Sequence, residues 1–441
     1  MEDSKIHIMI KKMLFAFIIF LLVLPLVQRK IDLLEIKPLQ GDYSVPSNPY
    51  FSLNNWFSDE YQLKQQDYFN KSIGFRGFFV RLYNQIYYSA FNTARAKDVV
   101  VGREDYLYEY NYIRAYLGRD FIGKEKIREK VSKLKIVRDS LYAKGIDIVV
   151  ILAPGKGSIY NEYIPAKYNP QKKTITNYEV YRDELNKSDI HFLDLNKWFL
   201  DINDTSRYPL FPKTGIHWSK YGETIAADTI LNYIASIRKI NMAKIVVDHI
   251  ETPDTVRSTD DDIEKGMNLL FDIEDLKMAY PSFSIVKDNN TTNPKVLTVA
   301  DSYYWGLFNF GLSKKAFNNG KFWFYNQQIY PDSYHKSKKV ADVNIKKEVQ
   351  KNDVIILMLT EANLFRFAFG FIDQLYDAYI NYDIEKIKTE KEARIQAYIH
   401  AIKETPEWFK NIKEQAKKQN ITLEEALRKN ANYMVWKEDN E

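Results

Sequence analysis

The chain has 441 residues, of which 45% are hydrophobic and 27% are charged, enough for one large domain or two ordinary ones with a substantial core. Its 63 basic and 58 acidic residues leave a net charge of only +5, so the composition indicates no nucleic-acid partner. Cysteine is absent, which excludes disulfides, thiolate metal sites and a cysteine nucleophile.

Residues 1–30 predict a membrane anchor. The run 13–27, MLFAFIIFLLVLPLV, has no charge and lies between Lys11-Lys12 and Arg29-Lys30. At about 1.5 Å per residue this run is short for a hydrocarbon core of roughly 30 Å, but the span extends over 6–27 if the two lysines snorkel toward head groups. No small-residue cleavage site follows the run, which favours a retained single-pass anchor over a cleaved signal peptide.

The rest of the chain divides by composition. Residues 31–94 are predicted to be a tether and an aromatic-rich lead-in, 95–380 the main body, and 381–441 a charged, helical C-terminal extension. Within the body, 240–294 contain the acidic run Asp260-Asp261-Asp262 and little regular pattern. This region is an insertion, a lid or, most simply, a solvated loop.

Helices and buried strands are predicted to alternate in the main body. Helical periodicity over 123–144 ends at Gly145, and the continuous apolar run 146–152 follows directly. A second helix and three further strands are predicted at 219–237, and at 190–194, 295–300 and 354–359. This alternation favours an α/β class with a three-layer α/β/α arrangement, whose ligands bind at the carboxyl ends of the strands.

One such strand end carries a candidate nucleophile. Ser302 follows the strand predicted at 295–300, and His217 lies about 85 residues earlier in the segment TGIHWS. A serine at the end of a buried strand can raise its hydroxyl above the sheet, and an imidazole on a second loop can take its proton during attack on an ester. The two residues together predict acyl-transfer chemistry.

Several segments in the same order resemble a known family. They are GREDYLY (102–108), APGKGSIYNEYIP (153–165), YPLFPKTGIHWS (208–219) with Tyr221-Gly222, and Ala300-Asp301-Ser302. They are similar to the SGNH-hydrolase-like domain of alginate O-acetyltransferase proteins of the AlgJ/AlgX type, over roughly 95–365. The resemblance implies an α/β/α fold and a serine acyl-enzyme, with Ser302 as nucleophile and His217 as its base.

The resemblance also leaves a gap in the catalytic set. Gly215 occupies the position of the family's aspartate, whose carboxylate orients the imidazole. Asp301, Glu361 and Asn363 are candidates for an orienting or oxyanion-binding group because they follow predicted strands. Asp194 and Asp201 could also approach His217, and a backbone carbonyl could fix the tautomer instead.

Three further residues are candidates for substrate binding. Lys156 could meet an anionic substrate, and the rings of Tyr160 and Trp218 could cover sugar faces. A loop lysine and ordinary aromatic packing are the simpler interpretations. Six histidines without cysteine offer little for a metal site, and the chemistry requires no cofactor.

The resemblance implies a protein that transfers acetyl or a similar acyl group to glycan hydroxyls. It further implies a multi-pass membrane-bound O-acyltransferase as acyl source, and an inner-membrane anchor with the body on the periplasmic side. Basic residues flank both ends of the anchor, so their count does not fix its orientation. Two alternatives remain at this point: a carbohydrate esterase that uses the same residues, or a non-catalytic glycan-binding or assembly protein in which Gly215 marks the loss of chemistry.

Overall fold

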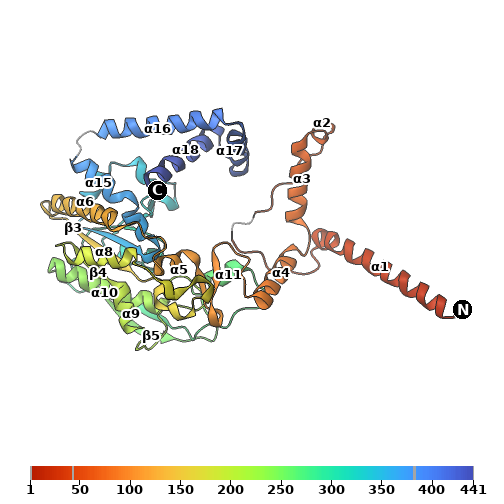
Figure 1. Ribbon diagram of the computed structural model, residues 1–441. Coiled ribbons are helices and arrows are strands. Elements are labelled where there is room, and N and C mark those ends of the chain that lie inside the picture. The colour runs from red at the N-terminus through yellow and green to blue at the C-terminus, as the bar shows by residue number, and fades with distance from the viewer. Residues whose placement is uncertain (1, 42–43, 381–383, 441) are drawn as a thin grey trace.

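A computed structural model describes residues 2–41, 44–380 and 384–440 (Figure 1). Its centre is a six-stranded sheet with the strand order β4-β3-β10-β7-β8-β9. The strands are β3 (Asp147–Ala153), β4 (His191–Asp194), β7 (Val296–Ala300), β8 (Phe322–Phe324), β9 (Gln328–Tyr330) and β10 (Val354–Thr360). All neighbouring pairs are parallel except β8 with β9. The four strands predicted from apolar runs are therefore confirmed.

Successive residues of the central strands feed two separate cores. In β3, Ile148, Val150 and Leu152 belong to one cluster, and Val149 and Ile151 belong to the other. A strand that is apolar on both faces needs helices on both sides, because successive side chains point to opposite faces of the sheet.

The helices supply those two covers. One face carries α6 (Lys124–Tyr142), α8 (Asn177–Asn186) and α15 (Phe371–Ile380), and the other carries α5 (Tyr110–Tyr116), α9 (Leu195–Ile202), α10 (Lys220–Arg238) and α12 (Tyr304–Asn309). The helix predicted at 123–144 is α6, and Gly145 follows it with a φ of 74°. The predicted three-layer α/β/α fold is confirmed.

Short elements complete the body. They are the hairpin of β1 (Val99–Val101) and β2 (Leu107–Glu109), the helices α7 (Lys156–Ile159), α13 (Leu312–Lys315) and α14 (Ile345–Val349), and the 3₁₀ segment η7 (Glu361–Gly370) that follows β10.

The region 240–294 is not a solvated loop. It contains an antiparallel pair, β5 (Lys244–Glu251) with β6 (Tyr280–Val286), and the short helix α11 (Asp262–Met267) between them. Asp260 and Asp261 are buried. β5 exposes most of its side chains and so carries no continuous apolar run, which is why no strand was predicted in this region.

The N-terminal part is helical. Within the described residues, Ile6–Ile31 of α1 (Glu2–Ile31) is the one stretch of helix long and apolar enough to cross a bilayer. The lead-in forms α2 (Leu53–Trp56), α3 (Asp59–Ser72) and α4 (Arg76–Phe91), and α1 projects away from the body (Figure 1).

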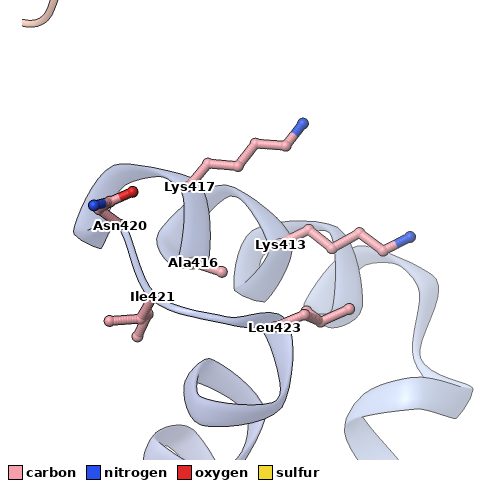
Figure 2. Close-up of a pocket in the computed structure, with 6 residues that line it drawn as sticks. All are labelled: Lys413, Ala416, Lys417, Asn420, Ile421 and Leu423. Atoms are coloured by element: carbon pink, nitrogen blue, oxygen red, sulfur yellow. The ribbon is translucent and has the colours of Figure 1, made fainter.

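The C-terminal extension is helical, as predicted. It consists of α16 (Ile384–Glu404), α17 (Pro406–Gln419) and α18 (Leu423–Asn440), which share a small apolar core of their own. Figure 2 shows a shallow hollow on this extension, lined by Lys413, Ala416, Lys417, Asn420, Ile421 and Leu423. All of these residues lie in α17, in α18 or between the two, away from the strands of the central sheet.

Candidate active site

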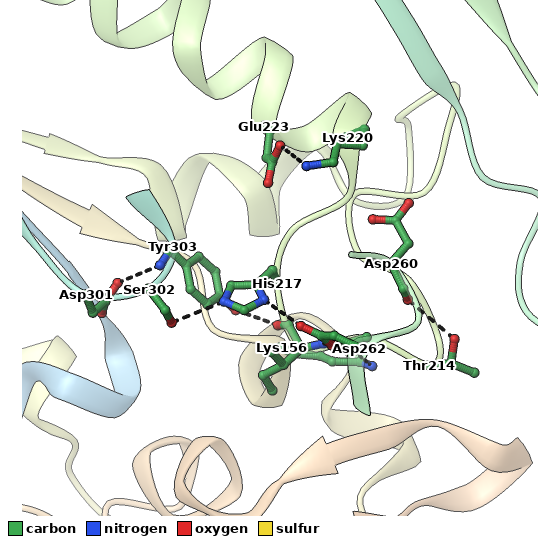
Figure 3. A network of polar contacts seen from close by, with 12 residues as sticks. Lys156, Thr214, His217, Lys220, Glu223, Asp260, Asp262, Asp301, Ser302 and Tyr303 are labelled. Carbon is green, nitrogen blue, oxygen red and sulfur yellow. Dashed lines mark hydrogen bonds and ion pairs between the residues drawn. The ribbon is translucent and has the colours of Figure 1, made fainter. Parts of the chain in front are cut away.

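The end of β7 presents Ser302 to His217. All five residues of β7 are buried, and Asp301 and Ser302 follow it directly before α12 begins. The Ser302 Oγ lies 3.1 Å from His217 Nε2 (Figure 3). Residues 85 apart in the chain therefore meet at hydrogen-bonding distance, which is the geometry that a nucleophile and its base require.

Neighbouring residues hold this pair together. The Tyr303 hydroxyl donates a 2.7 Å hydrogen bond to the Ile216 carbonyl, so the residue after the nucleophile is tied to the residue before the base. Ser219 caps α10: its Oγ accepts from Gly222 N and donates to the Pro209 carbonyl. The loop that carries His217 is thus fixed at both ends.

A carboxylate contacts the other imidazole nitrogen. Asp262 Oδ2 lies 2.8 Å from His217 Nδ1, and Asp262 Oδ1 accepts a 2.9 Å hydrogen bond from Ile216 N. Asp262 lies in the region whose simplest interpretation from sequence is a solvated loop, and no motif connects it with His217. The acidic run at 260–262 was the only sequence signal that could have drawn attention to it.

Gly215 leaves room for the segment that carries Asp262. A Cβ at position 215 would lie 2.5 Å from the Asp260 carbonyl oxygen and 2.9 Å from Pro212 Cγ. Side chains do not tolerate such a contact with backbone. The place of the family's aspartate is therefore closed, and Asp262 reaches the imidazole from a different segment.

The surroundings make His217 a stronger base. Burial opposes protonation of the imidazole, but the hydrogen bond and charge of Asp262, together with the charges of Glu223 and Asp301, outweigh burial and raise the pKa of His217. A carboxylate at Nδ1 also fixes the tautomer in which Nε2 is free to accept a proton.

Asp301 and Asn363 form a buried network at the nucleophile. Asp301 Oδ2 accepts from Thr360 N, Thr360 Oγ1 and Asn363 Nδ2 at 2.9, 2.8 and 2.9 Å, and Oδ1 accepts from Tyr303 N at 3.1 Å. This network joins the turn after β7 to the end of β10. Neither residue orients His217; both hold the backbone on which Ser302 sits.

Glu361 points into a separate buried cluster. Its carboxylate accepts from Ser158 Oγ at 2.5 Å and Asn196 Nδ2 at 2.8 Å. Burial raises the pKa of Glu361 to about 7, although both hydrogen bonds oppose that rise. Glu361 does not contact His217, and its cluster joins the start of η7 to α7 and α9.

Lys156, Tyr160 and Trp218, the residues expected to bind substrate, are buried and make contacts within the protein. Lys156 Nζ donates to the carbonyls of Lys213 and Gly215 at 2.7 and 2.6 Å, and burial lowers its pKa to about 7. The Tyr160 hydroxyl donates to the Phe211 carbonyl at 3.2 Å, and Trp218 packs on Tyr303. Lys156 and Tyr160 thus supply donors to carbonyls of the loop that leads to His217, which need partners inside the fold, whereas Trp218 contributes ring packing.

Residues 99–254 match a family model described as an SGNH hydrolase-like domain, acetyltransferase AlgX. Over these residues the chain is similar to SGNH hydrolase-like domains of the AlgX/AlgJ type. A curated relative, "Probable alginate O-acetylase AlgJ" of Pseudomonas putida, is 23% identical over 154 residues, which are 35% of this chain and 38% of that protein.

Two solved structures are similar to the chain. The O-acetyltransferase domain of Pseudomonas putida AlgJ is 17% identical with a TM-score of 0.39, covering 64% of this chain and 99% of that one. Pseudomonas aeruginosa AlgX is also 17% identical with a TM-score of 0.39, covering 62% and 67% respectively. The family match includes Gly215 and His217 but ends before Asp262 and Ser302.

Two residues that no sequence motif indicated, Tyr325 and Arg366, belong to the polar surroundings of Ser302 and Asp301. Burial raises the pKa of the Tyr325 hydroxyl, and hydrogen bonding to Ser302 and the charge of Arg366 oppose the rise. Arg366 Nη2 donates to Asn363 Oδ1 at 3.3 Å, and burial lowers its guanidinium pKa against the charges of Tyr325 and Asp301. No motif marks either residue, because both reach the site through the loops after β8 and β10.

Proposed function

We propose that this protein is an O-acyltransferase that moves acetyl or a similar acyl group to glycan hydroxyls through an acyl-Ser302 intermediate. The observation that carries the proposal is the line of contacts from Ser302 Oγ through His217 to Asp262. The match to an acetyltransferase family model supports an acetyl or similar group, and the similarity to a probable alginate O-acetylase supports a glycan acceptor.

In the first half-reaction, Ser302 Oγ attacks the carbonyl carbon of the acyl donor and His217 Nε2 takes the hydroxyl proton. Asp262 stabilises the imidazolium that forms, and backbone amides near Ser302 bind the oxyanion. The tetrahedral intermediate then collapses, His217 returns the proton to the leaving group, and the acyl-serine remains.

In the second half-reaction, His217 takes a proton from a glycan hydroxyl, whose oxygen attacks the acyl-serine. Collapse releases the acylated glycan, and the proton passes back to Ser302. If water attacks instead, the same residues act as an esterase.

The acyl donor is proposed to be a multi-pass membrane-bound O-acyltransferase, with α1 as the inner-membrane anchor and the body on the periplasmic side.

The carboxylate at Asp262 favours an enzyme over a non-catalytic assembly protein. Loss of the aspartate at position 215 was the reason to consider such a protein, and the described contacts supply a carboxylate to the same imidazole nitrogen. The anchoring part of the proposal is supported by the apolar helix Ile6–Ile31.

Ser302→Ala tests the mechanism. The full-length protein is incubated with p-nitrophenyl acetate, and both nitrophenolate release and acetyl transfer to an oligosaccharide are measured. We expect Ser302→Ala to lower both by at least about 10³-fold, because the nucleophile is gone. Exposed Ser282→Ala on β6 is the matched control and should behave as wild type.

Two further measurements separate the outcomes. A sulfonyl fluoride should add covalently to wild type and not to Ser302→Ala, as intact-mass spectrometry would detect. Unchanged acyl transfer by Ser302→Ala would reject the mechanism. Acetate release without transfer to any oligosaccharide would favour the esterase.

A further inference from the structure

The segment that carries Asp262 is held by hydrogen bonds from α4, the last helix of the lead-in. Asn84 of α4 donates from Nδ2 to the carbonyls of Met267 and Asn268 at 2.7 and 3.3 Å. Arg81, one turn earlier on α4, donates from Nη1 to the Leu269 carbonyl at 3.1 Å. Both α4 side chains are buried although α4 is otherwise largely exposed.

These contacts fall at the end of α11. The last carbonyls of a helix have no partner within it, so outside donors stabilise its end. Asn84 supplies such donors, and Asn268 adds a reciprocal pair with the backbone of Gln40: Gln40 N donates to Asn268 Oδ1 at 2.7 Å and Asn268 Nδ2 donates to Gln40 O at 3.1 Å. Arg81 Nη2 also donates to the Pro38 carbonyl at 2.8 Å, which ties the lead-in to the same point.

Asp262 lies at the other end of this helix. The helix α11 has only six residues, Asp262–Met267, and helices of that length depend on tertiary contacts for their position. Its start is held by the His217 side of the site, where Glu264 N donates to the Thr214 carbonyl at 3.2 Å. Its end is held by α4. Because α11 is one short rigid piece, displacement of its end shifts the carboxylate at its start.

We propose that Asn84 and Arg81 are positioning residues of the active site: by fixing the end of α11, they keep Asp262 in contact with His217. The inference rests on the proposed function. It makes activity depend on a lead-in that lies outside the region matched by the acetyltransferase family model, as Asp262 itself does. Gly215 leaves space for the backbone before α11, and the hydrogen bonds from α4 hold the end of α11. Both features serve to position Asp262.

The test uses the full-length protein and p-nitrophenyl acetate. Asn84→Ala is expected to lower kcat by about 10- to 100-fold with little change in KM, since small misplacements of supporting groups cost rates of this order. The acidic limb of the pH profile of kcat/KM should move to lower pH, because His217 loses part of the pKa rise that Asp262 gives it. Ile86→Ala, at an exposed position of α4, is the matched control and should be as active as wild type.

A double-mutant cycle distinguishes positioning from general destabilisation. If Asn84 acts through Asp262, Asn84→Ala should cost nothing further in an Asp262→Asn background. If Asn84→Ala folds poorly, the milder Gln85→Ala takes its place, because it removes the acceptor for Leu270 N and Phe271 N. It should show a smaller fall in kcat and a smaller shift of the acidic limb.

An equal loss in both backgrounds with an unmoved acidic limb would overturn the inference. That result is separable from failure of the proposed function, because Ser302→Ala would still abolish turnover. Full activity of Ser302→Ala would instead remove the proposed function and this inference together.

Discussion

Asp262 approaches His217 from a segment 45 residues further along the chain, and both of its carboxylate oxygens are used there. One oxygen contacts His217 Nδ1, and the other accepts from the backbone of Ile216. Because both oxygens are already held, the Asp262 carboxylate needs little reordering when the His217 imidazolium forms. The catalytic roles of Ser302, His217 and Asp262 remain proposals that substitutions can test.

Asp262→Asn is expected to lower turnover by about 10⁴-fold, because the imidazole loses both its tautomer preference and its charge partner. The acidic limb of kcat/KM should also move to lower pH. His217 must be neutral to act as base, its pKa is raised with Asp262 present, and removal of that carboxylate lets protonation occur only at lower pH. Steady-state rates from pH 4 to 9 check both effects. Wild-type turnover in this variant would show that Asp262 has no catalytic part.

Gly215→Ala is expected to reduce kcat by about 10- to 100-fold, because the added Cβ would press on the Asp260 backbone and displace the start of α11. Gly266→Ala is a matched control: it lies in α11, and a Cβ there meets nothing within 4 Å. Rates with p-nitrophenyl acetate compare the two. Equal activity of both variants would mean that Asp262 tolerates movement of its segment.

At the scale of elements, the sequence predicts what has a local pattern. The strands β3, β4, β7 and β10 were predictable from short apolar runs, and Ser302 from its place at the end of one of them. The pairing of Ser302 with His217 rested on the family resemblance, because His217 lies in the loop between α9 and α10 and follows no strand. The strands β8 and β9 have three residues each, too few for a periodic signal. The contact of Asp262 with His217 depends on packing of α11 against Gly215 and α4, which no short window of sequence contains.

The buried cluster between the start of η7, α7 and α9 leads to a prediction about stability. The folded-state pKa of Glu361 is raised to about 7 from an ordinary value near 4.5. Its contribution to the free energy of unfolding is therefore fully present below about pH 4.5 and is lost as the pH rises through 7. Glu361→Gln has no charge to bury. We expect the Tm of the variant relative to wild type to be higher at pH 8 than at pH 5.

Thermal unfolding at both pH values measures this difference. Glu424→Gln on α18 replaces an exposed carboxylate and should show no such pH dependence. A Tm difference for Glu361→Gln that is the same at pH 5 and pH 8 would mean that Glu361 does not titrate in the folded protein over this range.

At the scale of the whole molecule, α1 and the lead-in form one unit. A Cβ at Gly74, in the turn between α3 and α4, would lie 2.3 Å from the Pro25 carbonyl oxygen, so the end of α1 rests directly on this turn. The Arg29 guanidinium also lies over the rings of Tyr68 and Phe69. A bilayer crossed by α1 would therefore have its surface next to α3 and α4, the same helix α4 that holds α11.

That arrangement predicts where the exposed aromatic side chains of the lead-in lie. Trp56 and Phe57, at the end of α2, and Phe79 on α4 are exposed in the described structure, and rings of this kind favour the head-group region of a membrane. In vesicles of lipids brominated near the head group, the full-length protein should show tryptophan quenching that falls when Trp56 is replaced by Phe. Trp408→Phe, in the C-terminal extension, should leave the quenched fraction unchanged. Equal quenching of wild type and Trp56→Phe would place α2 away from the bilayer surface and contradict the prediction.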